Sequence, residues 1–213
     1  MKFAWRTSQR GITLIETLVG IFIVTMGIAT VVGTTVYSYT TYAKASQQVT
    51  AVGLAREGVE VVRNVRDTNW LKPNTLQDCP DPGFSQPIKC YPGWQNGWYA
   101  PCSSTGGCQA LFDSSSGQWT LIATTNYELH QQSDGSFGVL SSGGSAASFY
   151  RKIKVVGVNS TNPFTVQYPK VEVSTYVSWV GKGCADDYGA DPENAPDSCR
   201  IVLTDSFTNW KNY

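Results

Sequence analysis

An apolar segment close to the N-terminus constrains this chain more than any other feature. Between residues 12 and 36 the only charged side chain is Glu16, whereas residues 1–11 carry three basic side chains and no acid. A helix of this length is about 38 Å long, which is enough to cross a bilayer core of about 30 Å. Because basic flanks stay in the cytoplasm, we expect one membrane span with the C-terminal part of the chain on the outside.

A cleaved secretory signal peptide and an uncleaved signal anchor also combine a basic N-terminus with an apolar segment. A cleaved secretory signal has a shorter apolar region, followed by small residues of the A-x-A kind. Here the apolar run is too long, and residues 37–46, which follow it, read YSYTTYAKAS. An uncleaved signal anchor with a tolerated Glu16 stays open as the alternative.

Glu16 is the most specific feature of the segment, because a carboxylate within a membrane span is costly and usually functional. The string RGITLIE, residues 10–16, resembles the processing motif of type IV prepilins and type II secretion pseudopilins. The resemblance implies that residues 1–11 are a leader peptide, cleaved between Gly11 and Ile12 by a prepilin peptidase. That enzyme would also methylate the new amine of Ile12, a position at which the family most often has phenylalanine.

The same resemblance implies partners, a location and a role for Glu16. The partners are other pilin subunits, the prepilin peptidase and an inner-membrane assembly platform. The chain would lie in the bacterial inner membrane with its N-terminus in the cytoplasm, and would later join an extracytoplasmic filament. Because a buried carboxylate needs a partner, Glu16 is expected to meet the terminal amine of a neighbouring subunit and so fix the register of assembly.

Beyond the apolar segment, residues 37–70 are more polar but contain no proline, and the first proline of the chain is Pro73. Apolar side chains recur there at a helical period, on one face: Val52, Ala55, Val59 and Val62. Two pairs four residues apart are spaced to form ion pairs, Arg56 with Glu60 and Arg63 with Asp67. We therefore predict one helix from about Ile12 to about Arg66, apolar in its first half and amphipathic in its second.

Residues 71–213 are expected to form a globular, β-rich head. Residues 72–109 and the Gly/Ser-rich run 133–148 read as loops. Alternating apolar residues predict strands at 119–127, 150–158, 171–180 and 201–207. The predicted fold class is α+β, with an antiparallel sheet packed on the helix stripe, as in type IV pilins. The stretches LAREGVEVVRNVRDTNW and RIVLTDSFTNW also resemble those of minor pilins, including PilV-like ones.

The six cysteines indicate an oxidising compartment, because their even number outside the membrane suggests disulfides. Six cysteines allow fifteen pairings, of which closure between neighbours in sequence favours Cys79–Cys90, Cys102–Cys108 and Cys184–Cys199. The rival reading is a zinc site, but the chain has no C-x-x-C motif and its spacings fit no common zinc site.

Three further groups of residues have both a functional and a plain structural interpretation. Acids between Cys184 and Cys199, among them Asp186, Asp187 and Asp191, offer oxygen ligands for Ca²⁺, as in some pseudopilins, or form a solvated loop. Four aromatic residues could form a platform for a sugar or a partner, or could pack under loops: Tyr91, Trp94, Trp98 and Tyr99. The single histidine, His130, is expected at the surface.

Charge and motifs exclude several classes of function. The chain has 16 basic and 16 acidic residues, and loss of residues 1–11 leaves 13 basic against 16 acidic. This balance does not favour nucleic-acid binding. No P-loop, dinucleotide-binding glycine pattern or nucleophile elbow occurs, so we expect no enzymatic activity. The resulting expectation is a minor subunit of a type IV pilus or pseudopilus; the alternative is a pilus-borne or membrane-anchored adhesin that binds a sugar or a partner surface.

Overall fold

The computed structural model describes residues 13–71, 77–79, 88–90, 99–103, 106–113, 115–133, 135–139, 145–157, 170–181, 184 and 191–208. The chain forms two compact units, residues 1–45 and residues 46–213. Each unit is described by itself below.

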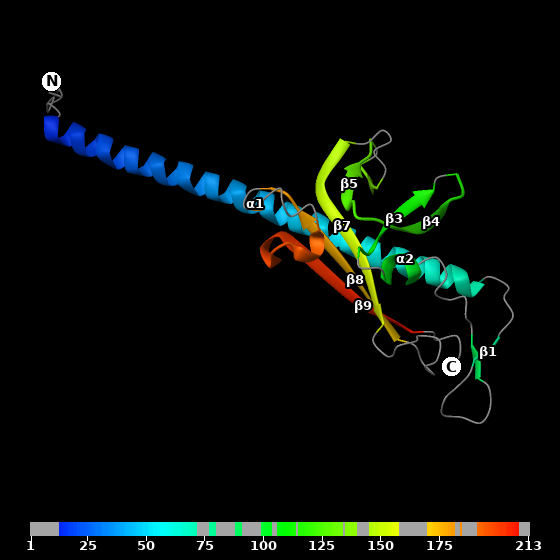
Figure 1. The fold of residues 1–213 in the computed structure, drawn as a ribbon. Helices are drawn as coiled ribbons and strands as arrows, with labels where there is room; N and C mark the ends of the chain where they lie inside the picture. The colour runs from blue at the N-terminus through cyan, green and yellow to red at the C-terminus, as the bar shows by residue number, and fades with distance from the viewer. Residues whose placement is uncertain are drawn as a thin grey trace, which may run out of the picture. The chain divides into compact units, whose positions relative to one another are not determined.

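A single long helix, α1, spans Leu14–Leu71 (Figure 1). The predicted start, Ile12, lies outside the described residues, and the helix ends five residues later than expected, two residues before Pro73. Proline cannot donate a helical hydrogen bond and disfavours helical geometry in the residue before it, which accounts for the end of the helix at this point.

The first unit contains the apolar half of α1. Its threonine side chains do not present free hydroxyl donors, because each hydroxyl donates to a backbone carbonyl three or four residues earlier. This holds for Thr17, Thr25, Thr30, Thr34 and Thr35, with oxygen–oxygen distances of 2.7–3.1 Å. By length and composition this helix could cross a membrane.

In the second unit, the other half of α1 buries a stripe of small and β-branched residues. Ala55, Val59 and Val62 are buried as predicted, whereas Val52 is only half-buried. The stripe extends instead to Ala51, Leu54, Gly58 and Val61. Because most of these side chains are small, the helix axis can lie close to the sheet.

The sheet of the second unit is antiparallel throughout (Figure 1). Its strands, among the described residues, are β3 (Cys108–Asp113), β4 (Gln118–Ala123), β5 (Glu128–Gln131), β6 (Phe137–Gly138), β7 (Ser145–Gly157), β8 (Lys170–Trp179) and β9 (Arg200–Thr208). Along one edge of the long strand β7, β5 pairs near its start and β3 at Ile153. Along its other edge β7 pairs with β8, which in turn pairs with β9. The described residues therefore form the α+β, type IV pilin-like fold that the sequence predicts.

Strand β8 supplies much of the surface that α1 covers. Within the strand predicted at 171–180, the five alternating residues of one face are all buried: Val171, Val173, Thr175, Val177 and Trp179. Two apolar clusters join this face to the helix, one around Val59, Val62 and Val173 and the other around Ala51, Leu54 and Val177. The core of the second unit is thus the layer between α1 and the sheet.

Several boundaries differ from the prediction. The strand expected at 119–127 ends at Ala123, and the Gly/Ser-rich run 133–148 contains β6 and the first residues of β7. Those residues are held extended because β5 pairs with them, which overrides their weak strand propensity. The expected loop 72–109 contains β1 (Gln77–Cys79), β2 (Ile88–Cys90), α2 (Tyr99–Ser103) and the start of β3.

Candidate functional site

The start of α1 presents a carboxylate in its first turn. The carbonyl of Thr13 accepts the backbone N–H groups of Glu16 and Thr17, at 3.0 and 3.3 Å, and so begins the helix. Glu16 lies where the helix dipole favours negative charge. The predicted cleavage and methylation residues, Gly11 and Ile12, lie outside the described part of the chain, so both assignments stay predictions.

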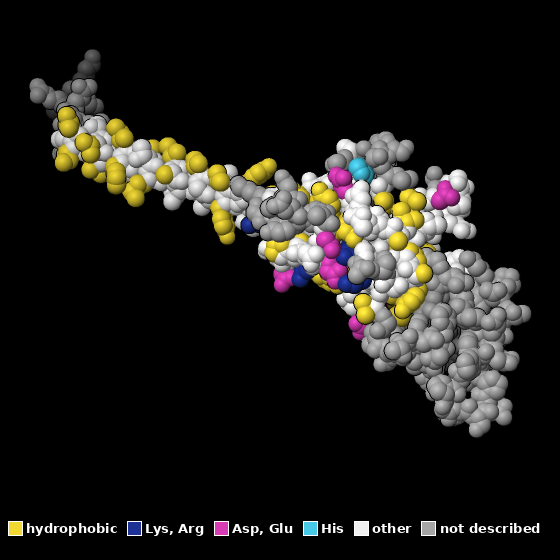
Figure 2. Space-filling view, viewed as in Figure 1, with side chains coloured by type: hydrophobic (Ala, Val, Ile, Leu, Met, Phe, Trp, Pro, Cys, Tyr) yellow, Lys and Arg dark blue, Asp and Glu magenta, His cyan; other side chains and the backbone are white. Residues whose placement is uncertain are grey.

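Around and beyond Glu16 the helix is covered with exposed apolar side chains. Figure 2 shows hydrophobic side chains along this half of the helix. The exposure is 81 % at Leu14 and still 57 % at Val36. These side chains are exposed in the described part of this unit, so the segment requires an apolar environment from outside: lipid, or other helices.

Among the described residues, two ion pairs join α1 to the sheet of the second unit. Arg151 of β7 is fully buried, and its Nη1 donates to Glu57 Oε1 of the helix at 2.9 Å. Arg63 Nη2 donates to Asp205 Oδ2 of β9 at 2.7 Å. Burial alone would lower the pKa of Arg63, but its bonds to Asp205 and Glu60 outweigh this effect and raise it.

The ion pairs expected within the helix are not the ones formed. Glu60 pairs with Arg63, and Asp67 pairs with Arg66, instead of Arg56 with Glu60 and Arg63 with Asp67. The spacing of charged residues along one helix does not predict this pairing. Arg63 also bonds to Asp205, which lies on the separate strand β9.

On the other face of β7, a lysine is buried among acids. Lys152 Nζ lies 3.1 Å from both carboxylate oxygens of Asp191 and 2.8 Å from Glu193 Oε2, and Lys154 Nζ lies 2.6 Å from Glu193 Oε1. Figure 2 shows acidic and basic side chains gathered together on this part of the surface. Burial opposes the charge of Lys152, but its two acidic partners outweigh burial and raise its pKa. The same contacts lower the pKa of Glu193 against its own burial. We call these four residues the ionic cluster.

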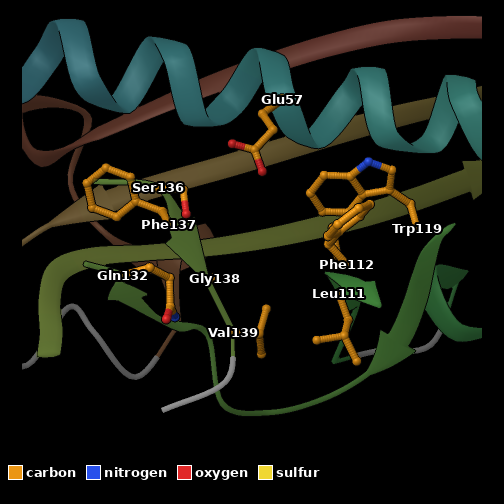
Figure 3. Close-up of a pocket in the computed structure, with 10 residues that line it drawn as sticks. Glu57, Leu111, Phe112, Trp119, Gln132, Ser136, Phe137, Gly138 and Val139 are labelled. Atoms are coloured by element: carbon orange, nitrogen blue, oxygen red, sulfur yellow. The ribbon is translucent and has the colours of Figure 1, made fainter. Parts of the chain in front are cut away.

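A cavity of about 670 Å³ opens between α1 and two β-hairpins, β3–β4 and β5–β6. Its lining is Glu57, Ala110, Leu111, Phe112, Trp119, Gln132, Ser136, Phe137, Gly138 and Val139. In Figure 3 the Glu57 carboxylate points from the helix toward the space between Phe137 on one side and the Phe112–Trp119 pair on the other. The cavity forms because β3 and β5 pair with different parts of β7 and leave space between their hairpins.

The remaining predicted site residues have mixed outcomes. Asp191 accepts bonds from Lys152 and from the backbone N–H of Glu193, the latter at 3.0 Å, and caps the short helix η2 (Pro192–Asn194). Asp186 and Asp187 lie outside the described residues, so calcium binding stays a prediction; within the described part of the chain no three potential metal ligands gather. Asp191 would have to leave its present partners to coordinate an ion.

Of the four aromatic residues with two interpretations, the structure describes Tyr99 and leaves the platform untested. Tyr99 packs partly buried against the apolar core at the start of α2, while Tyr91, Trp94 and Trp98 lie outside the described residues. His130, expected at the surface, is half-buried on β5, and its Nδ1 is enclosed and unpartnered. Its neighbour Leu129 is fully buried in the core, so the alternation of β5 places His130 on the opposite side of the strand.

Two of the three expected disulfides are described. Cys102 is bonded to Cys108, and Cys184 to Cys199. The first joins α2 to β3, and the second closes the segment that contains η2 and η3 (Asp197–Cys199). The side chains of Cys79 and Cys90 lie outside the described residues, although β1 and β2, which contain them, pair antiparallel.

The fold and the N-terminal segment together define a class of protein: an α+β chain of the type IV pilin-like kind, with an exposed apolar helix and a disulfide-containing head. Residues 6–32 match the family described as the prokaryotic N-terminal methylation motif. The chain therefore carries the signature of type IV pilins and pseudopilins. No curated protein and no solved structure matches the chain.

Neither the cavity nor the ionic cluster was predicted from the sequence. A usable signal existed in the string RKIKVV, residues 151–156, because adjacent cations in an apolar strand require acidic partners on both faces. The lining of the cavity had no such signal, since it comes from α1 and two separate hairpins.

Proposed function

We propose that this chain is a minor subunit of a type IV pilus or a related pseudopilus. In this role it is cleaved after Gly11, methylated at Ile12 and held in the inner membrane until α1 joins the filament core. The observation that carries the proposal is Glu16 in the first turn of a helix whose apolar side chains are exposed. The departure from phenylalanine at Ile12 and the cysteine-bearing head favour a minor over a major subunit.

The chemistry of assembly follows from two charges in an apolar environment. Cleavage creates a positive amine on Ile12, four residues before Glu16. An unpaired carboxylate among packed apolar helices is strongly unfavourable, so registers that leave Glu16 without an amine are disfavoured. The pair therefore selects one arrangement of neighbouring subunits. This role requires no metal, no nucleic acid and no reaction catalysed by the chain itself.

The first experiment is an intact-mass measurement on the protein from its native host, with and without the prepilin peptidase. We expect a chain that begins at N-methylated Ile12 only when the peptidase is present. A chain that still carries residues 1–11 in peptidase-positive cells would instead identify a signal-anchored surface protein.

We propose a second role, display of a ligand-binding surface by the head, as in a pilus-borne adhesin. The specific observation that favours it is the cavity beside Glu57, which has the size of a ligand site. Loss of binding in a head variant whose filaments stay intact would support this role.

A further inference from the structure

The cavity between α1 and the two hairpins has an aromatic wall. Phe112 of β3 and Trp119 of β4 are cross-strand partners, with ring centroids 5.1 Å apart and planes inclined by 54°. Phe112 is 49 % exposed, which is unusual for a large aromatic side chain beside a core. Phe137 lies on the opposite side of the cavity (Figure 3) and is fixed edge-on against Phe149, with centroids 5.7 Å apart. The rings are therefore held in place before any ligand arrives.

The polar side of the cavity is also held in place. Glu57 lines it, and one of its oxygens is bound by the fully buried Arg151. The other oxygen, Oε2, has no hydrogen-bond partner among the described residues. Arg151 holds Glu57 without reaching the cavity surface itself, so Arg151 is a positioning residue. Gln132 and Ser136 add an amide and a hydroxyl to the lining.

The charges of this site select the kind of ligand. Because Glu57 and Arg151 neutralise each other, the site has little net charge to attract an ion. A wholly apolar ligand would bury the remaining Glu57 oxygen without a hydrogen bond, which is costly. A neutral ligand with hydroxyl groups on one face and C–H groups on the other needs no net charge in the site and leaves the Glu57 oxygen with a hydrogen bond. Its hydroxyls donate to Glu57, and its C–H face packs on the aromatic rings.

From these observations we infer that the cavity binds a neutral carbohydrate, one or two hexose rings in length. Its volume of about 670 Å³ falls within the usual range for small-ligand sites, about 300–1,000 Å³. This inference rests on the second proposed role, ligand display by the head, and is independent of assembly through α1.

The test is saturation-transfer NMR on the full chain in phosphatidylcholine nanodiscs, which avoid the sugar headgroups of common detergents. The probes are maltose, lactose, cellobiose and N,N′-diacetylchitobiose. We expect transfer to the ring protons of at least one of them. Val139→Trp, which enlarges a lining side chain and so fills part of the cavity, should abolish transfer. Glu57→Gln should raise the Kd about tenfold, because it replaces a charged acceptor by a neutral one.

Glu60→Gln is the matched control for Glu57→Gln. Glu60 lies one helical turn further along α1 and also pairs with an arginine, but it does not line the cavity. Its loss should leave the Kd unchanged. Circular dichroism verifies the fold of each variant, and if Glu57→Gln fails to fold, Val139→Trp and Trp119→Phe test the same site.

The inference fails if none of the four sugars shows transfer, or if transfer persists in folded Val139→Trp protein. The mature mass of each variant, measured in the native host, reports processing separately. An unmodified chain that is processed normally but shows transfer to none of the four sugars would therefore overturn the carbohydrate site and leave the subunit role standing.

Discussion

At the scale of single residues, Gly58 determines how closely the helix can approach the sheet. A Cβ atom at this position would lie 2.7 Å from Thr175 Cγ2 and 2.9 Å from Thr175 Oγ1. Both distances are shorter than real Cβ contacts, so a side chain here would force Thr175 or the helix to shift. Glycine weakens a helix by about 1 kcal/mol relative to alanine, and here that cost is offset by closer packing.

We therefore predict that Gly58→Ala destabilises the head. The gain in helix propensity, about 1 kcal/mol, is outweighed by overpacking, which costs about 1–3 kcal/mol and here acts against a fully buried Thr175. Denaturant unfolding of the full chain in nanodiscs, followed by near-UV circular dichroism, should show a lower midpoint.

Gly53→Ala is the control for this prediction. Gly53 lies on the same helix, and a Cβ there would have no atom within 4 Å, so the substitution should stabilise by up to about 1 kcal/mol. Equal gains at Gly53 and Gly58 would show that the helix does not press on Thr175.

At the scale of elements, β7 is held from both faces. Arg151 anchors one face to α1 through Glu57, and Lys152 and Lys154 anchor the other to the segment that contains η2. The Cys184–Cys199 disulfide closes that same segment. The ionic cluster is therefore the contact through which a short, disulfide-closed segment is fixed to the sheet.

We predict that acid weakens this attachment. The pKa of Glu193 is lowered in the folded chain from its ordinary value of 4.5, so its contribution to stability is complete above that value. The contribution is lost as the pH falls through the lowered pKa, where the folded carboxylate takes up a proton. The free energy of unfolding should therefore fall with pH below about 4.5, and less steeply in Glu193→Gln.

Asp113 also stabilises the folded chain less as the pH falls, but at lower pH than Glu193. Hydrogen bonds from Ser115 and Ser116 lower its pKa from 3.8 to about 2. This part of the slope should persist in Glu193→Gln. Glu128→Gln, on β5 and outside the ionic cluster, is the control. If its pH dependence changes as much as that of Glu193→Gln, the ionic cluster is not the origin of the acid sensitivity.

The elements also show what sequence patterns can predict. The long helix and the buried face of β8 were predicted because each has a local signal, an apolar period of 3.6 or of 2 residues. The start of β7 was not predicted, since residues 145–148 are extended only because β5 pairs with them. For the same reason Arg63 was assigned to the wrong acid: its partner Asp205 lies 142 residues away.

At the scale of the whole molecule, the two units differ in what stabilises them. The second unit has a core between α1 and the sheet, whereas the first exposes its apolar side chains. The processing motif falls within the family match at residues 6–32 and was recognisable from sequence. The cavity of the head was not, because its lining residues range from Glu57 to Val139 along the chain.

We predict that Glu16→Val leaves membrane insertion intact but impairs entry into the filament. Valine is as apolar as its neighbours, so the segment still partitions into lipid. In the filament, however, the Ile12 amine of an adjacent subunit would lose its partner, a loss of about 3–5 kcal/mol for a buried pair. Fractionation of membranes and sheared filaments, followed by immunoblotting, measures both steps.

Ile15→Val is the control, because it changes an adjacent apolar residue without altering charge. It should enter filaments as the unmodified chain does. Normal incorporation of Glu16→Val would show that the pair between Glu16 and the Ile12 amine is not needed for assembly.

The threonine hydroxyls of the apolar helix have one more consequence. Because each of the five bonds to its own backbone, none of these five hydroxyls must find or give up a partner when its surroundings change. Movement of this segment from lipid into a bundle of helices, or back again, therefore exchanges one apolar environment for another. In the filament role proposed above, the balance between the two states then depends on side-chain packing and on Glu16, and the threonine hydroxyls favour neither state.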